Sequence, residues 1–249
     1  AALEAGTLES GEEDANVPFD TTPTGANPYA QFANQRPGTM AVAPDFAQLL
    51  IDKGDARQLV YFSLDGETYQ FADEDINEGA GLFWSTNSSP MPMISYTEVK
   101  FLEAEAKLRT GDIPGSEAAL QEAIEASYRQ LGQWGGDFQN FIDGYIATNG
   151  TYATNNLEES LDRLMEEKYI ALYAQAEAEV WADYRRTGYP SFIEPKADGE
   201  AGGLNPGGQI PRRFIYPRSE RITNPDNIEA AISRQGGGLL SDDIWAFEP

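Results

Sequence analysis

The sequence predicts a mostly helical fold built from antiparallel helical hairpins, with long irregular loops and a small β-hairpin. Three observations support this prediction. Two consecutive segments with helical spacing of apolar residues flank a tight turn near residue 112, and a second strong helical pattern covers residues 157–187. The 249 residues also include 15 Pro and 24 Gly, which point to long ordered loops. At this length we expect one domain over residues 1–249 with a sizeable core.

The clearest element is a helical hairpin over residues 94–131. Its two helices, Ile94 to Arg109 and Ser116 to Leu131, place apolar residues three or four positions apart. Between them, Thr110 to Gly115 forms a tight turn. Small residues on both helices allow a close approach; they are Ala104, Ala106, Ala118 and Ala119. Two helices of this length joined by such a turn are typical of a tetratricopeptide unit.

Shorter elements are expected along the rest of the chain. The first 40 residues are rich in Pro and Gly and predict a loop. Two short apolar strands, residues 59–62 and 68–71, flank Asp65-Gly66 and predict a β-hairpin. The residues from 157 to 187 form either one long helix or two joined end to end, capped by Asn155 or Asn156. The remaining short helices are expected at residues 41–51, 136–148 and 226–234.

Composition excludes several classes of function. The sequence contains no Cys and no His, which rules out zinc sites built on them, cysteine nucleophiles, Ser-His-Asp triads and disulfides. A pair of carboxylates remains the only catalytic option. With 41 acidic residues no pair is singled out, so we expect no enzyme. The net charge of -24 argues against nucleic acid as a partner and leaves neutral ligands, cations and basic partners open.

Four segments carry a recognisable pattern through their order and spacing. The first opens a helix with an aromatic and an acidic residue and then repeats Glu-Ala, and the second is the Gly-Asp turn. The segments are Ile94–Ala106, Gly111–Asp112 with the helix after it, Glu166–Gly188, and Ile210–Pro217 with Glu220, Asn224 and Asn227. Together they resemble the C-terminal half of SusD/RagB proteins, which are nutrient-binding lipoproteins of the bacterial outer membrane. The resemblance covers roughly residues 27–235.

This resemblance implies a SusD-like α-α superhelix and a non-catalytic protein at the cell surface. The implied ligand is an extracellular glycan, either an oligosaccharide or a polysaccharide, which would pass to a SusC-type TonB-dependent outer-membrane transporter. Family members are longer, so the resemblance implies a missing N-terminal half that carries the lipid anchor. Without that half we expect exposed apolar faces on the helix 94–109. Two alternatives stay open: an oligopeptide-binding member of the family, and a helical-repeat interaction scaffold without a small ligand.

Four of the five candidate ligand-binding residues lie before residue 94. A glycan needs flat aromatic faces for its C–H surface, and amide or charged side chains for its hydroxyl groups. Trp84 and Asn87, in the sequence Trp-Ser-Thr-Asn, are the best local match, with Tyr61 and Tyr69 upstream. Trp134 is a further aromatic in a Gly-rich loop. The alternative for Trp84 is that it packs beneath its own loop.

A cluster of conspicuous residues near the C-terminus has a structural interpretation. Trp181 lies on the apolar stripe of its helix and is expected in the core. Asp183 and Arg186 are three positions apart and are expected to pair. We expect Arg212 and Arg213 to pair with helix carboxylates such as Asp183.

An acidic stretch at residues 73–79 invites a calcium interpretation, because carboxylates at alternate positions suit that cation. A calcium-binding EF-hand loop needs Gly at its sixth position and Glu at its twelfth. This stretch has Glu78 and Trp84 there. We therefore predict a solvated acidic loop and no cofactor, although some members of the SusD/RagB family bind calcium.

Overall fold

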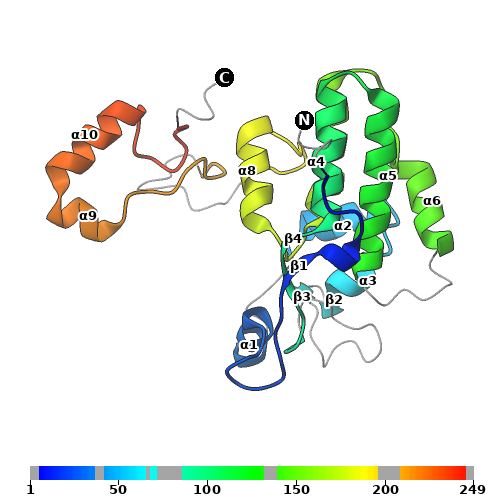
Figure 1. Cartoon of the computed structure of the whole chain (residues 1–249). Coiled ribbons are helices and arrows are strands. Elements are labelled where there is room, and N and C mark those ends of the chain that lie inside the picture. The colour runs from blue at the N-terminus through cyan, green and yellow to red at the C-terminus, as the bar shows by residue number, and fades with distance from the viewer. Residues whose placement is uncertain are drawn as a thin grey trace. The chain divides into compact units, whose positions relative to one another are not determined.

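The computed structural model (Figure 1) describes residues 6–36, 42–65, 68–71, 86–131, 139–195 and 208–244, with the backbone alone at 63–65 and 68–71. The chain divides into two compact units, Ala1–Val180 and Trp181–Pro249. Our expectation of a single domain over 1–249 stays a prediction. The fold class is confirmed, because α-helices dominate the described residues and strands form only short two-stranded sheets.

The expected helical hairpin is the centre of the first unit. Helices α4 (Tyr96–Arg109) and α5 (Ile113–Gln130) lie side by side in Figure 1. The Asp112 carboxylate accepts the Gly115 N–H at 3.0 Å and caps α5, so the helix begins three residues earlier than expected. Ser116 Oγ donates to the Ala104 carbonyl at 2.7 Å, which requires the close helix approach that the small residues predicted. The hairpin is confirmed, and its identity as a tetratricopeptide unit stays a prediction.

Three more helices follow in the chain: α6 (Gln139–Asn149), α7 (Leu157–Ala171) and α8 (Glu177–Thr187). The segment from 157 to 187 is therefore two helices. Ala174 between them has a φ of 59°, a left-handed conformation that interrupts an α-helix. Of the two expected caps, Asn156 is confirmed: its side chain accepts the Glu158 N–H at 2.9 Å.

Residues 6–36 contain more regular structure than we expected. The short 3₁₀ helix η2 (Gly11–Glu13) precedes strand β1 (Ala15–Val17), which pairs antiparallel with β4 (Met91–Ile94). Helix α1 (Pro28–Gln35) begins at a proline and is capped by Asn27. The prediction of a loop here is wrong, because the same Pro and Asn that break one element can begin the next.

Helix α2 (Pro44–Asp52) confirms the expected helix near residues 41–51. The β-hairpin is also confirmed, formed by β2 (Phe62–Asp65) and β3 (Thr68–Phe71) with Phe62 opposite Phe71. Its first strand begins later than predicted, since residues 58–61 form the single turn α3 (Gln58–Tyr61). In the second unit, α9 (Arg218–Thr223) precedes α10 (Pro225–Gln235), which confirms the helix expected at 226–234.

The core of the first unit joins α2 and α3 to α5 and α7. Phe46 of α2 stacks on Tyr173 with ring centroids 5.0 Å apart, and Tyr173 also contacts Tyr61 at 4.8 Å. Leu120, Ile124 and Leu164 are fully buried. Throughout the described residues, no helix combines the length and apolarity that a membrane span requires.

Candidate functional site

Most of the predicted ligand-binding residues fall where the structure gives no side chain. Trp84 and Trp134 lie outside the described residues, as does the acidic stretch at 73–79. Tyr69 belongs to strand β3, for which the backbone alone is described. Within the described parts of the chain, no three acidic side chains gather in a way that could hold a metal ion. The roles proposed for these residues stay predictions.

Asn87 is described, and it lies on a segment that is firmly held. The Asn27 N–H donates to the Asn87 carbonyl at 2.8 Å, and the buried Asn27 amide donates to the Ser89 carbonyl at 2.8 Å. Thr86 and Ser89 bond to each other through their hydroxyls at 2.7 Å. These contacts fasten the residues directly after position 85 to the start of α1. The Asn87 side chain is half-buried.

The structure places Tyr61 in the core, which corrects its assignment as a ligand-binding residue. Its side chain is 2% exposed and its ring packs against Tyr173, so neither face is available to a sugar. Among the described residues its hydroxyl has no hydrogen-bond partner. Burial raises the pKa of this hydroxyl, the nearby charge of Arg57 acting in the opposite direction. The sequence predicted a strand over residues 59–62, whereas Tyr61 ends the helical turn α3 and is buried.

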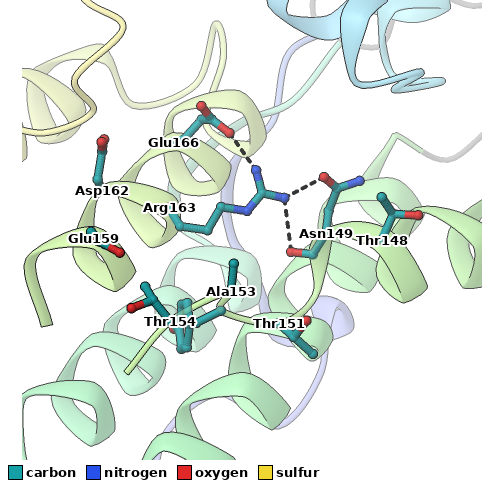
Figure 2. Close-up of a pocket in the computed structure, with 10 residues that line it drawn as sticks. Thr148, Asn149, Thr151, Ala153, Thr154, Glu159, Asp162, Arg163 and Glu166 are labelled. Carbon is teal, nitrogen blue, oxygen red and sulfur yellow. Dashed lines mark hydrogen bonds and ion pairs between the residues drawn. The ribbon is translucent and has the colours of Figure 1, made fainter. Parts of the chain in front are cut away.

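A pocket of about 550 Å³ opens between the C-terminal end of α6, the loop 150–156 and α7 (Figure 2). Its walls are polar. Three threonines, Thr148, Thr151 and Thr154, line one part, and three carboxylates, Glu159, Asp162 and Glu166, line another. None of these residues was predicted as a site residue from the sequence, because hydroxyls and acids spread between positions 148 and 166 form no recognisable motif.

Arg163 of α7 lies in the pocket wall and is held on both sides. Its guanidinium donates to Glu166 at 2.7 Å, and to the side-chain and backbone oxygens of Asn149 at 2.5 and 3.3 Å. Figure 2 shows the side chain bridging α7 to the end of α6. The guanidinium is thus already bonded within the protein, and it fixes the distance between the two walls.

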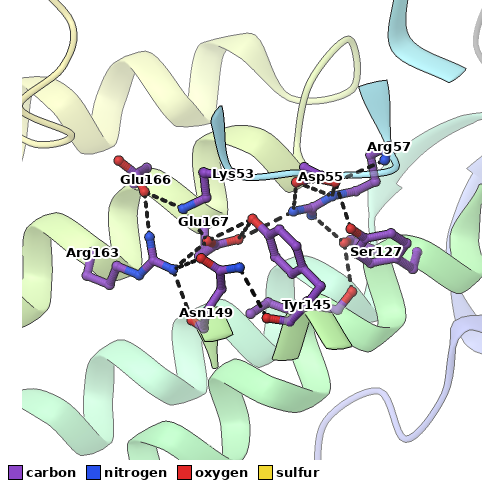
Figure 3. Close-up of polar contacts among 11 residues, drawn as sticks. Lys53, Asp55, Arg57, Ser127, Tyr145, Asn149, Arg163, Glu166 and Glu167 are labelled. Atoms are coloured by element: carbon purple, nitrogen blue, oxygen red, sulfur yellow. Dashed lines mark hydrogen bonds and ion pairs between the residues drawn. The ribbon is translucent and has the colours of Figure 1, made fainter. Parts of the chain in front are cut away.

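Behind the pocket lies a buried ionic cluster, drawn in Figure 3. Glu167 is fully buried, and its carboxylate lies 2.8 Å from Lys53 Nζ, 3.2 Å from Arg163 and 3.4 Å from Arg57. Tyr145 of α6 donates to the same carboxylate at 3.1 Å. Lys53 also lies 2.5 Å from Glu166. The cluster therefore joins the segment after α2 to both α6 and α7.

The charges in this cluster balance. It contains the cations Lys53, Arg57 and Arg163 and the carboxylates of Asp55, Glu166 and Glu167. Arg57 and Asp55 have no exposed side-chain surface. Burying ions is costly unless each is paired, and here every member has an opposite charge within 4 Å. The cluster is thus a structural support, and it adds no net charge to the pocket.

Residues of the second unit correct two of our expectations. Trp181 is half-buried instead of lying in the core: its indole donates to the Pro211 carbonyl at 2.7 Å and Arg185 lies 3.8 Å from its ring. Arg212 pairs with Asp243 at 2.6 Å, not with Asp183. The pair between Asp183 and Arg186, at 2.7 Å, is confirmed. The prediction for Trp181 was wrong because an apolar stripe on a helix does not show how completely other segments bury it.

Comparison with solved structures gives matches at low sequence identity. A SusD homologue from Bacteroides fragilis is 21% identical, with a TM-score of 0.75 over 100% of this chain and 61% of that one. A second B. fragilis SusD homologue is 17% identical, with a TM-score of 0.72, covering 98% and 59%. A chitin-binding protein is 20% identical, with a TM-score of 0.73, covering 100% and 58%. These identities establish a common fold, and the chain spans about three fifths of each structure.

Comparison of sequences gives the family. No curated protein sequence matches the chain significantly. The sequence profile of a SusD-like family, described as starch-binding and associating with the outer membrane, matches residues 1–217. That match covers most of the chain and agrees with the resemblance seen in its four segments. The chain therefore belongs to the SusD-like family of starch-binding proteins that associate with the outer membrane.

Proposed function

We propose that this protein binds an extracellular oligosaccharide or polysaccharide without catalysis and delivers it to a SusC-type TonB-dependent transporter. The observation that carries the proposal is the match of residues 1–217 to a starch-binding family associated with the outer membrane. A structural neighbour that is a chitin-binding protein supports a glycan as the ligand class. The absence of Cys and His from the sequence supports binding over catalysis.

In this proposal Trp84 and Asn87 form the main contact surface, and Tyr69 and Trp134 extend it. An indole face covers the C–H surface of a sugar ring, while an amide donates to and accepts from its hydroxyls. The fastening of residues 86–89 to α1 supports this assignment. A loop whose end is already fixed loses less conformational freedom when it closes on a ligand.

We further propose that the protein is anchored by a lipid at the outer surface through an N-terminal segment. An N-terminal half would pack with this chain and complete the superhelix. Apolar side chains at the surface support such a neighbour, since Met93 is 73% exposed, Ile94 53% and Leu102 48%. Ile94 and Leu102 lie in the segment 94–109, where the sequence predicts exposed apolar faces, and Met93 directly precedes it.

The direct test is a titration of the full chain with starch-derived and chitin-derived oligosaccharides and with oligopeptides, followed by tryptophan fluorescence and calorimetry. We expect saturable binding of one glycan type, weakened at least tenfold in Trp84→Ala, a loss typical of a buried aromatic contact. Trp181→Phe is the matched control, because this tryptophan packs against Phe214 and bonds to Pro211. Binding of peptides alone, or equal glycan affinity in Trp84→Ala and wild type, would contradict the proposal.

A further inference from the structure

The candidate glycan-binding residues are concentrated in one stretch of the chain, residues 62–89, which contains Tyr69, Trp84 and Asn87. The structure describes both ends of this stretch. Strand β2 begins it at Phe62, and residues 86–89 at its other end are bonded to the start of α1. Both ends lead to the connection between α7 and α8, residues 172–176. The placement of the candidate residues therefore depends on how the two ends are held at this connection.

The first end is held by aromatic packing. Tyr61, the residue directly before β2, packs its ring against Tyr173 with centroids 4.8 Å apart. Tyr173 belongs to the connection and also stacks on Phe46 of α2 at 5.0 Å. Tyr61 and Phe46 are both buried. The start of the β-hairpin is thus packed against the connection.

The second end is held through α1. Asn27 bonds residues 87 and 89 to the start of this helix. Two positions further along, the Tyr29 hydroxyl donates at 2.7 Å to the carboxylate of Glu177, the first residue of α8. Burial and this carboxylate raise the pKa of Tyr29, so the hydroxyl stays protonated and donates at neutral pH. Tyr29 thereby joins α1 to a residue 148 positions away in the chain.

The bond from Tyr29 differs from other contacts that α1 makes. Gln31 donates to the Ala26 and Pro23 carbonyls at 2.9 and 3.3 Å, and both belong to the loop directly before the helix. Ala30 is fully buried, but the burial of an apolar side chain has no preferred direction. A hydrogen bond to a charged group depends steeply on distance and angle. The Tyr29 bond is therefore suited to fix how α1 lies against the start of α8.

The connection that receives both ends is itself well bonded. Ala174 is buried and adopts the left-handed conformation that ends α7. The Gln175 side-chain amide donates to the Ala171 carbonyl at 3.0 Å, and its backbone N–H donates to the Leu172 carbonyl at 3.1 Å. Gln175 is buried as well. Buried bonds of this kind open rarely in the native state, so the connection can serve as a fixed support.

We infer that the hydrogen bond between Tyr29 and Glu177 positions residues 86–89, and with them Asn87, for glycan binding. The inference rests on the proposed function, because it concerns the same ligand surface. Tyr29 and Glu177 are positioning residues that act through α1 and Asn27. Without their bond α1 is less firmly placed, and ordering the attached segment on a ligand then costs more conformational entropy.

The first test is hydrogen exchange of the full chain without ligand. It follows two amides: that of Asn27, which donates to the Asn87 carbonyl at 2.8 Å, and that of Ser89, which donates to the Thr86 carbonyl at 3.1 Å. Tyr29→Phe removes the hydroxyl and keeps the ring. It should speed exchange at both amides by about threefold to tenfold, as expected for the loss of one net hydrogen bond.

Partner and control variants separate positioning from general stability. Glu177→Ala should match Tyr29→Phe, and the double variant should add little, because both changes remove one bond. Glu177→Gln keeps an acceptor and should return exchange towards the wild-type rate. Glu179→Ala removes a carboxylate from the same first turn of α8 and controls for its charge. Asn156→Ala loses a helix cap at the opposite end of α7 and controls for a similar loss of stability.

Glycan affinity is the functional readout. With starch-derived and chitin-derived oligosaccharides, Tyr29→Phe and Glu177→Ala should bind about threefold to tenfold more weakly than wild type. Glu177→Gln should recover most of that affinity, and the controls Glu179→Ala and Asn156→Ala should keep it. If Tyr29→Phe fails to fold by circular dichroism, the comparison of Glu177→Gln with Glu177→Ala decides.

Three results would overturn the inference: wild-type exchange at Ser89 in Tyr29→Phe, unchanged glycan affinity in that variant, or the same effects in Asn156→Ala. A wild-type chain that binds no glycan would instead contradict the proposed function. Exchange at Ser89 would still show whether the bond holds residues 86–89. The two failures are therefore distinguishable.

Discussion

Arg57 Nη2 lies 2.5 Å from Asp55 Oδ2, and neither side chain is exposed to solvent. The Arg57 Nε donates to both Asp55 oxygens at 3.0 Å, and Tyr128 donates to Asp55 Oδ1 at 2.7 Å. Arg57 also donates to Ser127 Oγ at 2.7 Å, with its guanidinium 4.7 Å from the Tyr128 ring. This pair thereby ties the segment after α2 to helix α5. The pair stabilises the folded state only while both side chains remain charged.

Replacing Asp55 by Ala should destabilise the protein strongly. The variant leaves the Arg57 guanidinium buried without its paired carboxylate. Removing one partner of a buried ion pair costs about 3–5 kcal/mol in comparable cases. The free energy of unfolding in urea measures the effect. Glu125→Ala is the control, because it breaks an exposed pair with Arg129 that should contribute less than about 1 kcal/mol. Similar losses in the two variants would contradict this account of the cluster.

Acid should remove part of the stability that Asp55 contributes. Burial by itself raises the pKa of Asp55, but the charge of Arg57 and the hydrogen bonds from Arg57 and Tyr128 outweigh it and lower the pKa below 3.8. The folded state therefore binds this proton more weakly than the unfolded chain. The contribution is present above about pH 4 and is lost as pH falls through the lowered pKa. Urea unfolding from about pH 6 to about pH 2 should show a shallower decline in Asp55→Asn than in wild type. Parallel declines would refute the assignment.

Elements fixed by nearby residues could be predicted from the sequence. The turn of the α4–α5 hairpin depends on Asp112 and on Gly111, whose φ is 84°, and both act within a few positions. Asn156 caps α7 through N–H groups two and three residues away. Such contacts are local, so the sequence itself indicates them. Helix α1 was missed although its cap and first proline are local, because the surrounding Pro and Gly favoured a loop.

Contacts between distant segments could not be predicted. Strand β1 pairs with β4, which is more than seventy residues away, and short strands carry little sequence signal. Glu167 lies in a segment that supported the family resemblance, yet nothing in the sequence shows that Arg57 bridges it to Asp55. The pocket beside Arg163 depends on how α6 meets α7. Tyr61 illustrates the same point, since burial follows from packing rather than from residue type.

Truncating two adjacent residues of α4 should change stability by very different amounts. Phe101 is 1% exposed, whereas Leu102 is 48% exposed. Phe101→Ala should cost about 3–5 kcal/mol, because it leaves a cavity in the hairpin core. Leu102→Ala should change stability by less than about 1 kcal/mol in this chain, since half of its side chain is already in water. Urea unfolding of both variants measures the difference. A loss above that limit in Leu102→Ala would show that α4 is covered on this side.

Asn27 has two separate roles that substitutions can separate. Its side-chain oxygen Oδ1 accepts the Tyr29 and Ala30 N–H groups at 2.8 and 3.4 Å and caps α1. Its amide nitrogen donates to the Ser89 carbonyl at 2.8 Å, and the residue is fully buried. Asn156 makes the equivalent two capping bonds at an exposed position, and within the described residues its side chain has no distant partner. The two residues therefore form a matched pair.

Asn156→Ala should cost about 1 kcal/mol, the usual value of a helix cap. Asn27→Ala should cost that amount plus about 1–3 kcal/mol more, because the buried Ser89 carbonyl loses its donor. Asn27→Asp keeps the cap but places a carboxylate oxygen against the Ser89 carbonyl. It should therefore lose only the stability that the hydrogen bond to Ser89 contributes. Urea unfolding gives the stabilities, and glycan titration gives the effect on ligand affinity. Equal losses in Asn27→Ala and Asn156→Ala would mean that the bond to Ser89 contributes nothing. If Asn27→Asp loses stability but keeps its glycan affinity, then the attachment of residues 86–89 to α1 does not contribute to ligand binding.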